Sequence, residues 1–506
     1  MAGAFAVSRN HLIFGLCLPL AILLGYLLAE PLESTSLAIV VMVLAVLAVP
    51  VLMRWYHPLL IVSWNAAVTP YFLPGQPQLW ILMAGLGLLF AVLNRSVNPA
   101  HQFLHVPALI RPLLVLLVVV AATAMTTGGF GMAVLGSESY GGKGYFYLAA
   151  AAAGYFALTS RPIPPARAQL YVALFFLSGL TAIVSHLAYV AGPKFYFLYE
   201  LFPVSTALDQ AAADMALDKG MVRLGGLPTA AQAIFSFLLA RYGIEGVFNF
   251  AKPWRGILFF GALMASTFGG FRSAIIFMGL TFAISFYLER LWRTRVFLML
   301  IFIGTLGGVL LLGFAKHFPP SVQRAISFLP VNIDPLIQQS AETSTDWRLE
   351  MWKAVVPQIP QYLFKGKGYA LSPDDVYLVG ESTWRGLTTS WEGAALAGDY
   401  HSGPLSVIIP FGIYGVVAFG WLLAAGTRYL HGNYRRSPPA LRRINRYLFA
   451  LFVARMVFFV LVYGHFKVEL YYLVGILGLS VALNANTRQL KEQNEEPPLP
   501  EIGWSR

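Results

Sequence analysis

Charged residues are scarce in this chain of 506 residues, because Asp, Glu, Lys and Arg together make up only 11%. A soluble domain carries about 25% charged residues, so this surface could not be kept in water. Cysteine is almost absent as well. The single residue, Cys17, excludes an internal disulfide and a cysteine-rich zinc cluster. Hydrophobic residues reach 58% and the mean hydropathy is +0.66. The composition therefore excludes a string of soluble domains and predicts a polytopic membrane protein.

Apolar runs long enough to cross about 30 Å of hydrocarbon recur along the chain. We predict an all-α polytopic membrane protein with about 12–14 transmembrane helices. The predicted spans are Leu12–Ala29, Ser36–Met53, Pro58–Leu73, Leu79–Leu93, Pro112–Thr127, Gly144–Thr159, Gln169–Ala191, Pro228–Ala240, Gly256–Gly270, Ser273–Leu288, Val296–Phe314, Pro404–Ala425, Tyr447–Tyr463 and Val468–Leu483.

Positive charge gathers on one side of these spans. The net charge is +12, and the segment Thr427–Arg446 holds six arginines and no acid. Cytoplasmic segments are enriched in Lys and Arg, so this side, together with both termini, is predicted to be cytoplasmic. The same rule explains the basic charge better than nucleic-acid binding does, and no nucleic-acid partner is expected.

The predicted spans divide the chain into five parts, two of which contain long outer loops. The largest loop is expected to contain amphipathic helices and to face the periplasm if the membrane is a bacterial inner membrane. The parts are N-terminal transmembrane helices (1–191), central transmembrane helices with a first outer loop and a hairpin at Arg272 (192–314), the large outer loop (315–403), C-terminal transmembrane helices (404–483) and a cytoplasmic tail (484–506).

Two arginines lie at the outer ends of predicted spans, where a lone arginine is unusual. Arg272 lies between two apolar runs that predict a tight helical hairpin, and Arg223 ends the first outer loop. A guanidinium can hold a phosphate with two parallel hydrogen bonds, so both are candidate phosphate ligands. The alternative for each is a snorkelling arginine that anchors a span at the membrane surface.

Arg348 lies in a part of the large loop that is predicted to be helical. Thr343-x-x-Asp346 matches a capping box, which predicts that a helix starts at this point. Such a helix would hold Arg348 near its positive N-terminal end, where anions bind. The alternative is a solvated arginine paired with Asp346 or Glu350.

His401 lies just before the span at Pro404. Its unperturbed pKa of ~6.5 suits proton abstraction at neutral pH, and the nearby Asp399 could orient or charge the ring. An interfacial histidine without a catalytic role is the alternative.

Three polar residues fall inside predicted spans: Asn65, His186 and Arg455. Polar groups at membrane depth often carry function, but the sequence shows no relay that connects these three.

The order of these features resembles the O-antigen ligase and O-antigen polymerase family, whose members are membrane glycosyltransferases of the C type. The resemblance covers roughly Met221 to Ala425. In the hairpin, Phe-Arg-Ser stands where the family commonly has Ser-Arg followed by a small residue, and Ser402 stands where asparagine is frequent. The matching motifs are Arg223-Leu-Gly-Gly-Leu-Pro, Gly269-Gly-Phe-Arg272-Ser273, Arg348-x-x-x-Trp352, Gly366-x-Gly368, Asp399-Tyr-His401-Ser402-Gly-Pro-Leu and Phe411-Gly-Ile-Tyr-Gly415.

The resemblance implies glycan transfer at the periplasmic face of a bacterial inner membrane. The donor would be a saccharide on a polyprenyl diphosphate, and the acceptor would be a sugar hydroxyl. Arg272 and Arg348 would hold the diphosphate with help from Arg223. His401, supported by Asp399 and Tyr400, would assist removal of the acceptor proton, with inversion at the anomeric carbon.

No cofactor and no metal are expected, because guanidinium groups can stabilise a departing diphosphate in place of a cation. Many metal-dependent C-type enzymes carry acidic residues in the outer loop that directly follows their first span. Here the loop between the first two predicted spans, after Ala29, is short and holds only Glu30 and Glu33.

Several functional alternatives stay open. We favour a polymerase of O-antigen or exopolysaccharide repeats, because nothing in the sequence marks a lipid A partner. A ligase that transfers the glycan to lipid A core, a transporter or flippase for a lipid-linked sugar, and a scaffold are the others. The expected partners are the lipid-linked donor, a glycan or lipid-linked acceptor, membrane lipids, and polysaccharide assembly or export proteins.

Overall fold

The computed structural model describes residues 22, 25, 34–73, 75–97, 103–131, 141–202, 224–372, 374, 377 and 391–495. Throughout these residues the regular structure is helical, with no strand, which confirms the predicted all-α class. The chain forms two compact units, Met1–Tyr56 and His57–Arg506. The described candidate site residues, Arg272, Arg348, Asp399, Tyr400 and His401, belong to the second unit.

Eight helices in the described part of the chain are long and apolar enough to cross a membrane, which supports a polytopic membrane protein. One of these spans, Pro165–Ala191, is composite. It consists of η2 (Pro165–Arg167), α6 (Ala168–Leu177), η3 (Ser178–Ile183) and α7 (Val184–Ala191). The others are formed by α3 (Leu79–Val97), α4 (Pro107–Thr127), α11 (Arg272–Glu289), α12 (Arg295–Phe314) with η6 (Ala315–His317), α18 (Gly403–Arg435), α19 (Arg442–Leu461) and α20 (Phe466–Glu495).

Further helices join these spans. They are α2 (Ser34–Trp64), α5 (Gly142–Leu158), η4 (Pro193–Glu200), α9 (Gly226–Val247), α10 (Trp254–Thr267) and η5 (Leu291–Arg293). The span predicted at Pro228 continues as α9 past Arg241, although its backbone is not helical at Gly243. α20 extends far beyond the predicted end at Leu483, so the start of the predicted tail is helical.

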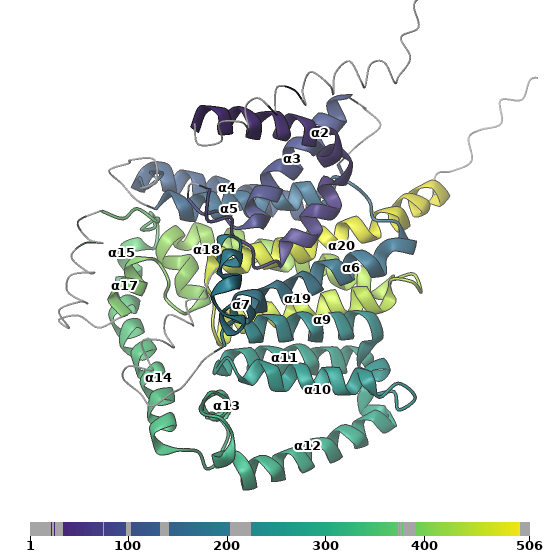
Figure 1. Cartoon of the computed structure of the whole chain (residues 1–506), viewed down its shortest axis with the longest axis vertical. Helices are drawn as coiled ribbons and strands as arrows, with labels where there is room; N and C mark the ends of the chain where they lie inside the picture. Colours follow the sequence, from purple (N-terminus) through teal and green to yellow (C-terminus); the bar gives the residue numbers. More distant parts are fainter. Residues whose placement is uncertain are drawn as a thin grey trace, which may run out of the picture. The chain divides into compact units, whose positions relative to one another are not determined.

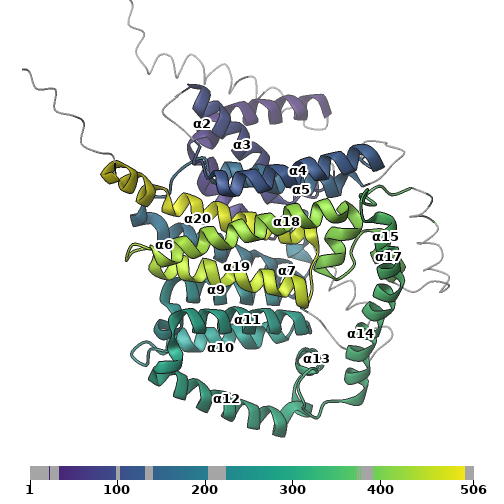
Figure 2. The same cartoon turned by 180° about the vertical axis from the view of Figure 1, so that it is seen from behind.

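The helices of the second unit pack around one continuous apolar core, whose large, fully buried side chains include Trp80, Phe235, Phe411 and Phe452. Figures 1 and 2 show α9, α11, α18, α19 and α20 running roughly parallel to one another. In both views α14 (Pro335–Val355) crosses one end of these helices. At that end α9, α11, α18 and α20 begin and α19 ends, and we call it the site end.

The described part of the large outer loop consists of short helices around α14. They are α13 (Pro320–Ile326), η7 (Val356–Gln358), α15 (Ile359–Tyr362) and α17 (Trp391–Leu396).

The start of α14 differs from the prediction. The helix begins at Pro335, and its N-cap is Asp334, whose carboxylate accepts a hydrogen bond from the Leu336 N–H. The Thr343 hydroxyl donates instead to the Gln339 carbonyl within the helix. The prediction of a helix start at Thr343 is therefore wrong. Arg348 lies more than three turns from the N-terminus, which is too far for the helix dipole to act on an anion beside it.

The spans predicted at Ser36–Met53 and Pro58–Leu73 also differ from the structure. α2 is a single helix that runs to Trp64, and the chain beyond it is not helical. The Asn65 amide donates to the Phe175 carbonyl at 2.7 Å, and the Ala67 N–H donates to the Thr181 hydroxyl at 2.8 Å. The composite span thus bonds the Asn65 side chain and also satisfies the Ala67 backbone N–H, which a longer helix would have satisfied internally.

Candidate active site

The hairpin that joins α10 to α11 places Arg272 at the site end. Gly270 makes the turn with φ at +67°, a conformation that favours glycine, and its N–H donates to the Thr267 carbonyl at 3.0 Å. Arg272 is the first residue of α11. Its Nη2 donates to the Ala341 carbonyl at 2.9 Å and to the Thr345 hydroxyl at 3.0 Å, so the side chain reaches from the hairpin to α14.

A third arginine, Arg324 on α13, lies between the hairpin and α14. Its side chain is buried, with 8% of the residue exposed. Nη1 donates to the Gly270 carbonyl at 3.1 Å, and Nη2 donates to the Ser344 hydroxyl at 2.6 Å. The sequence analysis missed this residue, because Ser-Val-Gln-Arg-Ala-Ile carries no motif. The available signal was Pro319-Pro320, which is typical of a helix start.

One cavity of about 300 Å³ is lined by all three arginines, which come from α11, α13 and α14. Among the described residues its lining holds no acidic side chain, so this part of the cavity wall is electropositive. Burial, followed by the neighbouring Arg272 guanidinium, lowers the pKa of Arg348, and only Tyr463 and Asp399 act in the opposite direction. An anion in this cavity would relieve the repulsion between like charges. The lining residues are Gly270, Phe271, Arg272, Ser273, Ile276, Arg324, Phe328, Ser344, Thr345, Arg348 and Val462.

His401 lies in the segment that enters α18, with φ in the left-handed region at +49°. Its backbone N–H donates to Asp399 Oδ1 at 3.3 Å, and its Nε2 is 3.8 Å from Asp399 Oδ2. Burial lowers the pKa of His401; Asp399 raises it and Arg348 lowers it. The net lowering keeps the imidazole neutral at neutral pH. Its buried Nδ1 has no hydrogen-bond partner among the described residues, so it is available to take a proton.

Aromatic rings connect His401 to the arginine cavity. The His401 ring is 5.0 Å from the ring of Trp347, the residue before Arg348, and 5.2 Å from the ring of Tyr463. The Arg348 Cζ is 6.0 Å from the same Tyr463 ring. The structure thus brings Arg272, Arg348 and His401 into one neighbourhood.

Asp399 and Tyr400, which were predicted to support His401, differ in how they contact it. Asp399 contacts the imidazole directly. Tyr400 is buried in an apolar cluster with Met351, Val355 and Leu405, and burial raises the pKa of its phenol. Its carbonyl accepts a hydrogen bond from Trp352 Nε1 at 2.8 Å, which joins α14 to the start of α18. Tyr400 is therefore anchored in this cluster and fixes the position of its neighbour, His401.

Arg223 lies outside the described residues, so its position relative to the cavity stays a prediction. Within the described residues, no three His, Cys, Asp or Glu side chains gather as metal ligands would. Metal independence stays a prediction as well.

Comparison with curated proteins gives no match. A family model does match one segment of the chain. Residues 257–420 contain the hairpin, α13, α14 and the segment that enters α18, and they match the family model described as O-antigen ligase. This match confirms the chain's resemblance to the O-antigen ligase and O-antigen polymerase family and supports membrane glycan transfer of that general type.

Proposed function

We propose that this protein transfers a glycan at the periplasmic face of a bacterial inner membrane. The donor is a saccharide on a polyprenyl diphosphate and the acceptor is a sugar hydroxyl, so that repeats of O-antigen or exopolysaccharide are joined. The observation that carries the proposal is the single cavity in which Arg272, Arg324 and Arg348 converge beside a neutral His401.

The arginines act on the leaving group. As the bond between the anomeric carbon and the diphosphate breaks, the diphosphate departs with the electron pair and gains negative charge. Guanidinium groups fixed in advance by Ala341, Thr345 and Ser344 stabilise this charge without reorganising. A donor of this kind contributes roughly 3–4 kcal/mol in other enzymes.

His401 acts on the nucleophile. The acceptor hydroxyl attacks the anomeric carbon, and its proton moves to His401 Nδ1, which is the ring nitrogen without a partner among the described residues. The resulting imidazolium is stabilised by Asp399, 3.8 Å from Nε2. A single displacement of this type inverts the anomeric configuration, and a base contributes typically 10²–10⁴-fold.

Purified protein and isolated lipid-linked saccharide test the mechanism. We expect Arg272→Ala and Arg348→Ala to lower kcat/KM by about 10²–10³-fold each, and His401→Ala to lower kcat by at least 10²-fold. Lys353→Ala, which removes an exposed cation from α14, is the matched control and should retain wild-type activity. Full transfer by both arginine variants would refute the enzyme mechanism, and full transfer by the histidine variant would refute the base.

The choice between polymerase and ligase is tested in a deletion strain. We expect single repeats to accumulate on the carrier lipid, because a polymerase would join them. Long chains that accumulate on the carrier would instead identify a ligase.

A further inference from the structure

The segment that connects α19 to α20, residues 462–465, brings a tyrosine to the active site. Tyr463 directly follows Val462, which lines the arginine cavity. The connection lies at the site end, because α19 ends and α20 begins there. Both residues lie outside residues 257–420, which match the family model, and no motif of the sequence analysis contains them. The site therefore includes a side chain for which the proposed mechanism has not yet given a role.

Close backbone packing fixes this connection against the entrance of α18. A Cβ atom on Gly464 would lie only 2.7 Å from the Cα of Gly403, so glycine is needed where the two segments approach each other. At the start of α20 the Phe466 N–H donates to the Ser406 hydroxyl at 3.0 Å. Because His401 lies two residues before Gly403, this packing holds the connection beside the proposed base.

The Tyr463 ring lies close to the two residues that act at the two ends of the proposed reaction. Its centre is 5.2 Å from the centre of the His401 ring and 6.0 Å from the Arg348 Cζ. Arg348 holds the departing diphosphate, and His401 takes the proton of the acceptor hydroxyl. In a single displacement, the leaving group and the nucleophile are on opposite sides of the anomeric carbon. The transferred sugar therefore lies between these two residues, within reach of Tyr463.

The Tyr463 hydroxyl is available to contact a substrate. It makes no hydrogen bond to any described residue, and the side chain is partly exposed. Burial is the largest influence on this phenol and raises its pKa to about 12; Asp399 raises the pKa further, and Arg348 lowers it. The hydroxyl therefore stays protonated at neutral pH and can donate a hydrogen bond.

We propose that Tyr463 is a further catalytic residue, whose hydroxyl donates a hydrogen bond to the polar substituent on the carbon next to the anomeric carbon of the transferred sugar. This inference rests on the proposed function. As the bond to the diphosphate breaks, the sugar becomes oxocarbenium-like, and hydrogen bonds to this substituent strengthen in such a transition state. An interaction that is stronger in the transition state than in the bound substrate raises kcat more than it lowers KM.

Tyr463→Phe tests the proposal, because it removes the hydroxyl and keeps the ring. We expect kcat for transfer from the lipid-linked saccharide to fall about 10–100-fold, with the KM changed less than about threefold and the thermal midpoint in detergent unchanged. Tyr287→Phe is the matched control. This tyrosine is 67% exposed and lies near the far end of α11, so the variant should keep the wild-type kcat. A wild-type kcat in Tyr463→Phe would overturn the proposal.

Polyprenyl diphosphate without a sugar, which is a product of the proposed transfer, locates the contact. It should inhibit wild-type protein and Tyr463→Phe with the same inhibition constant, because the hydroxyl contacts the sugar and not the diphosphate. Weaker inhibition of Tyr463→Phe would place the contact on the diphosphate and overturn its assignment to the sugar.

Arg348→Ala separates this inference from the proposed function. If Arg348→Ala loses transfer while Tyr463→Phe keeps the wild-type kcat, the proposed function stands and the role of Tyr463 is refuted. Normal transfer by Arg348→Ala would refute the proposed function, and the role of Tyr463 would fall with it.

Discussion

Two charged neighbours act on the pKa of His401 in opposite directions. Burial is the largest influence and lowers the pKa, Asp399 raises it, and Arg348 lowers it. Because the pKa lies below the ordinary value of ~6.5, the imidazole stays able to accept a proton throughout neutral pH. That ability is lost as the pH falls through the lowered pKa. We therefore expect the acid limb of the kcat/KM profile to lie below pH 6.5.

Asp399→Asn tests this assignment. The substitution removes the carboxylate that raises the pKa of His401, so the acid limb should move to a lower pH. The maximal rate should fall as well, because the imidazolium loses its partner. The pH profile of transfer is the measurement, and Asp374→Asn, which changes an exposed carboxylate of the same loop, is the control. A limb that stays in place or moves upward would show that another group titrates.

Arg324 provides a second prediction at the level of single residues. Arg324→Gln removes two charge-assisted hydrogen bonds, to Gly270 and Ser344, each of which contributes about 1.5–3 kcal/mol. We expect kcat/KM for the donor to fall about 10–100-fold, mainly through KM. Arg324→Lys should recover part of the loss because it keeps the charge.

The control for Arg324 is Arg293→Gln, which changes an exposed arginine after α11. The transfer assay and the thermal midpoint are measured together for all three variants. An unchanged donor KM, with loss of stability alone, would restrict Arg324 to a structural role.

Among the elements, the hairpin depends on one backbone conformation. Gly270 has φ at +67°, and a residue with a Cβ pays about 1–2 kcal/mol in this region. Gly270→Ala should therefore lower the thermal midpoint and, because Arg272 follows the turn, also lower kcat. Gly279→Ala on α11 is the matched control, since an added methyl group there meets no atom within 4 Å. Equal midpoints for the two variants would contradict this account of the turn.

The helices also show which parts of the fold could be predicted from the sequence and which could not. The Arg272 hairpin could be predicted, because two apolar runs separated by Gly-Gly leave few other arrangements. The start of α14 was mispredicted, because Thr343-x-x-Asp346 imitates a capping box inside a helix that is already capped by Asp334. The local sequence pattern around Thr343 cannot tell the start of a helix from the interior of a helix that began earlier, at Pro335. Arg324 could not be predicted, because its role depends on α13 lying between the hairpin and α14.

For the whole molecule, the cationic cavity leads to a prediction about metals. Among the described residues, three arginines and no carboxylate line the cavity, so a divalent cation would meet a site that already carries positive charge. We expect EDTA to leave the rate of transfer unchanged and added Mg²⁺ to leave it within twofold. Transfer by protein purified in chelator is the measurement. A rate that falls in EDTA and returns with Mg²⁺ would contradict the prediction.

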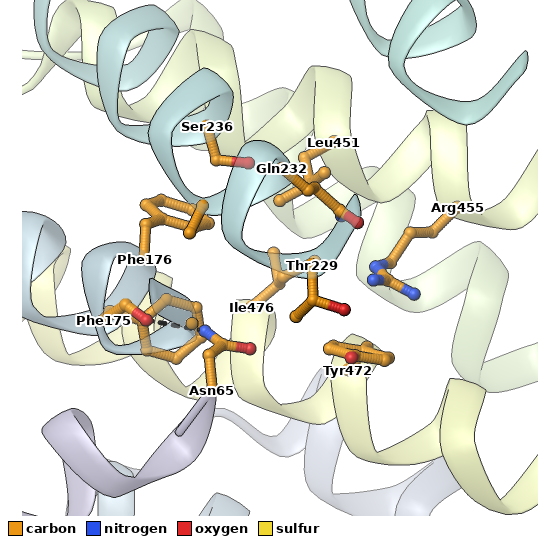
Figure 3. A pocket seen from close by; sticks show the side chains of 12 residues that line it. Asn65, Phe175, Phe176, Thr229, Gln232, Ser236, Leu451, Arg455, Tyr472 and Ile476 are labelled. Carbon is orange, nitrogen blue, oxygen red and sulfur yellow. Dashed lines mark hydrogen bonds between the residues drawn. The ribbon is translucent and has the colours of Figure 1, made fainter. Parts of the chain in front are cut away.

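A small cavity between the membrane-spanning helices is lined in part by Asn65 and Arg455 (Figure 3), and this arrangement could not be predicted from the sequence. Asn65 and Arg455 stood out as polar residues in apolar runs, but they are 390 positions apart and share no motif. Only the packing of α9 against the composite span and against α19 places both on one cavity. Such long-range placement depends on how helices pack in the membrane, which periodicity alone does not specify.

The hydrogen bonds that hold α14 in place affect how large substrates enter and leave the site. The helix is bonded to Arg272 and Arg324 near its middle and to Tyr400 near its end. A helix fastened at these positions cannot swing outward as a hinged cover without breaking several charge-assisted bonds at once. We therefore expect the carrier lipid to arrive and depart sideways, through the plane of the bilayer. The turnover rate would then depend on lateral diffusion of the carrier lipid and on glycan release, and not on an opening movement of α14.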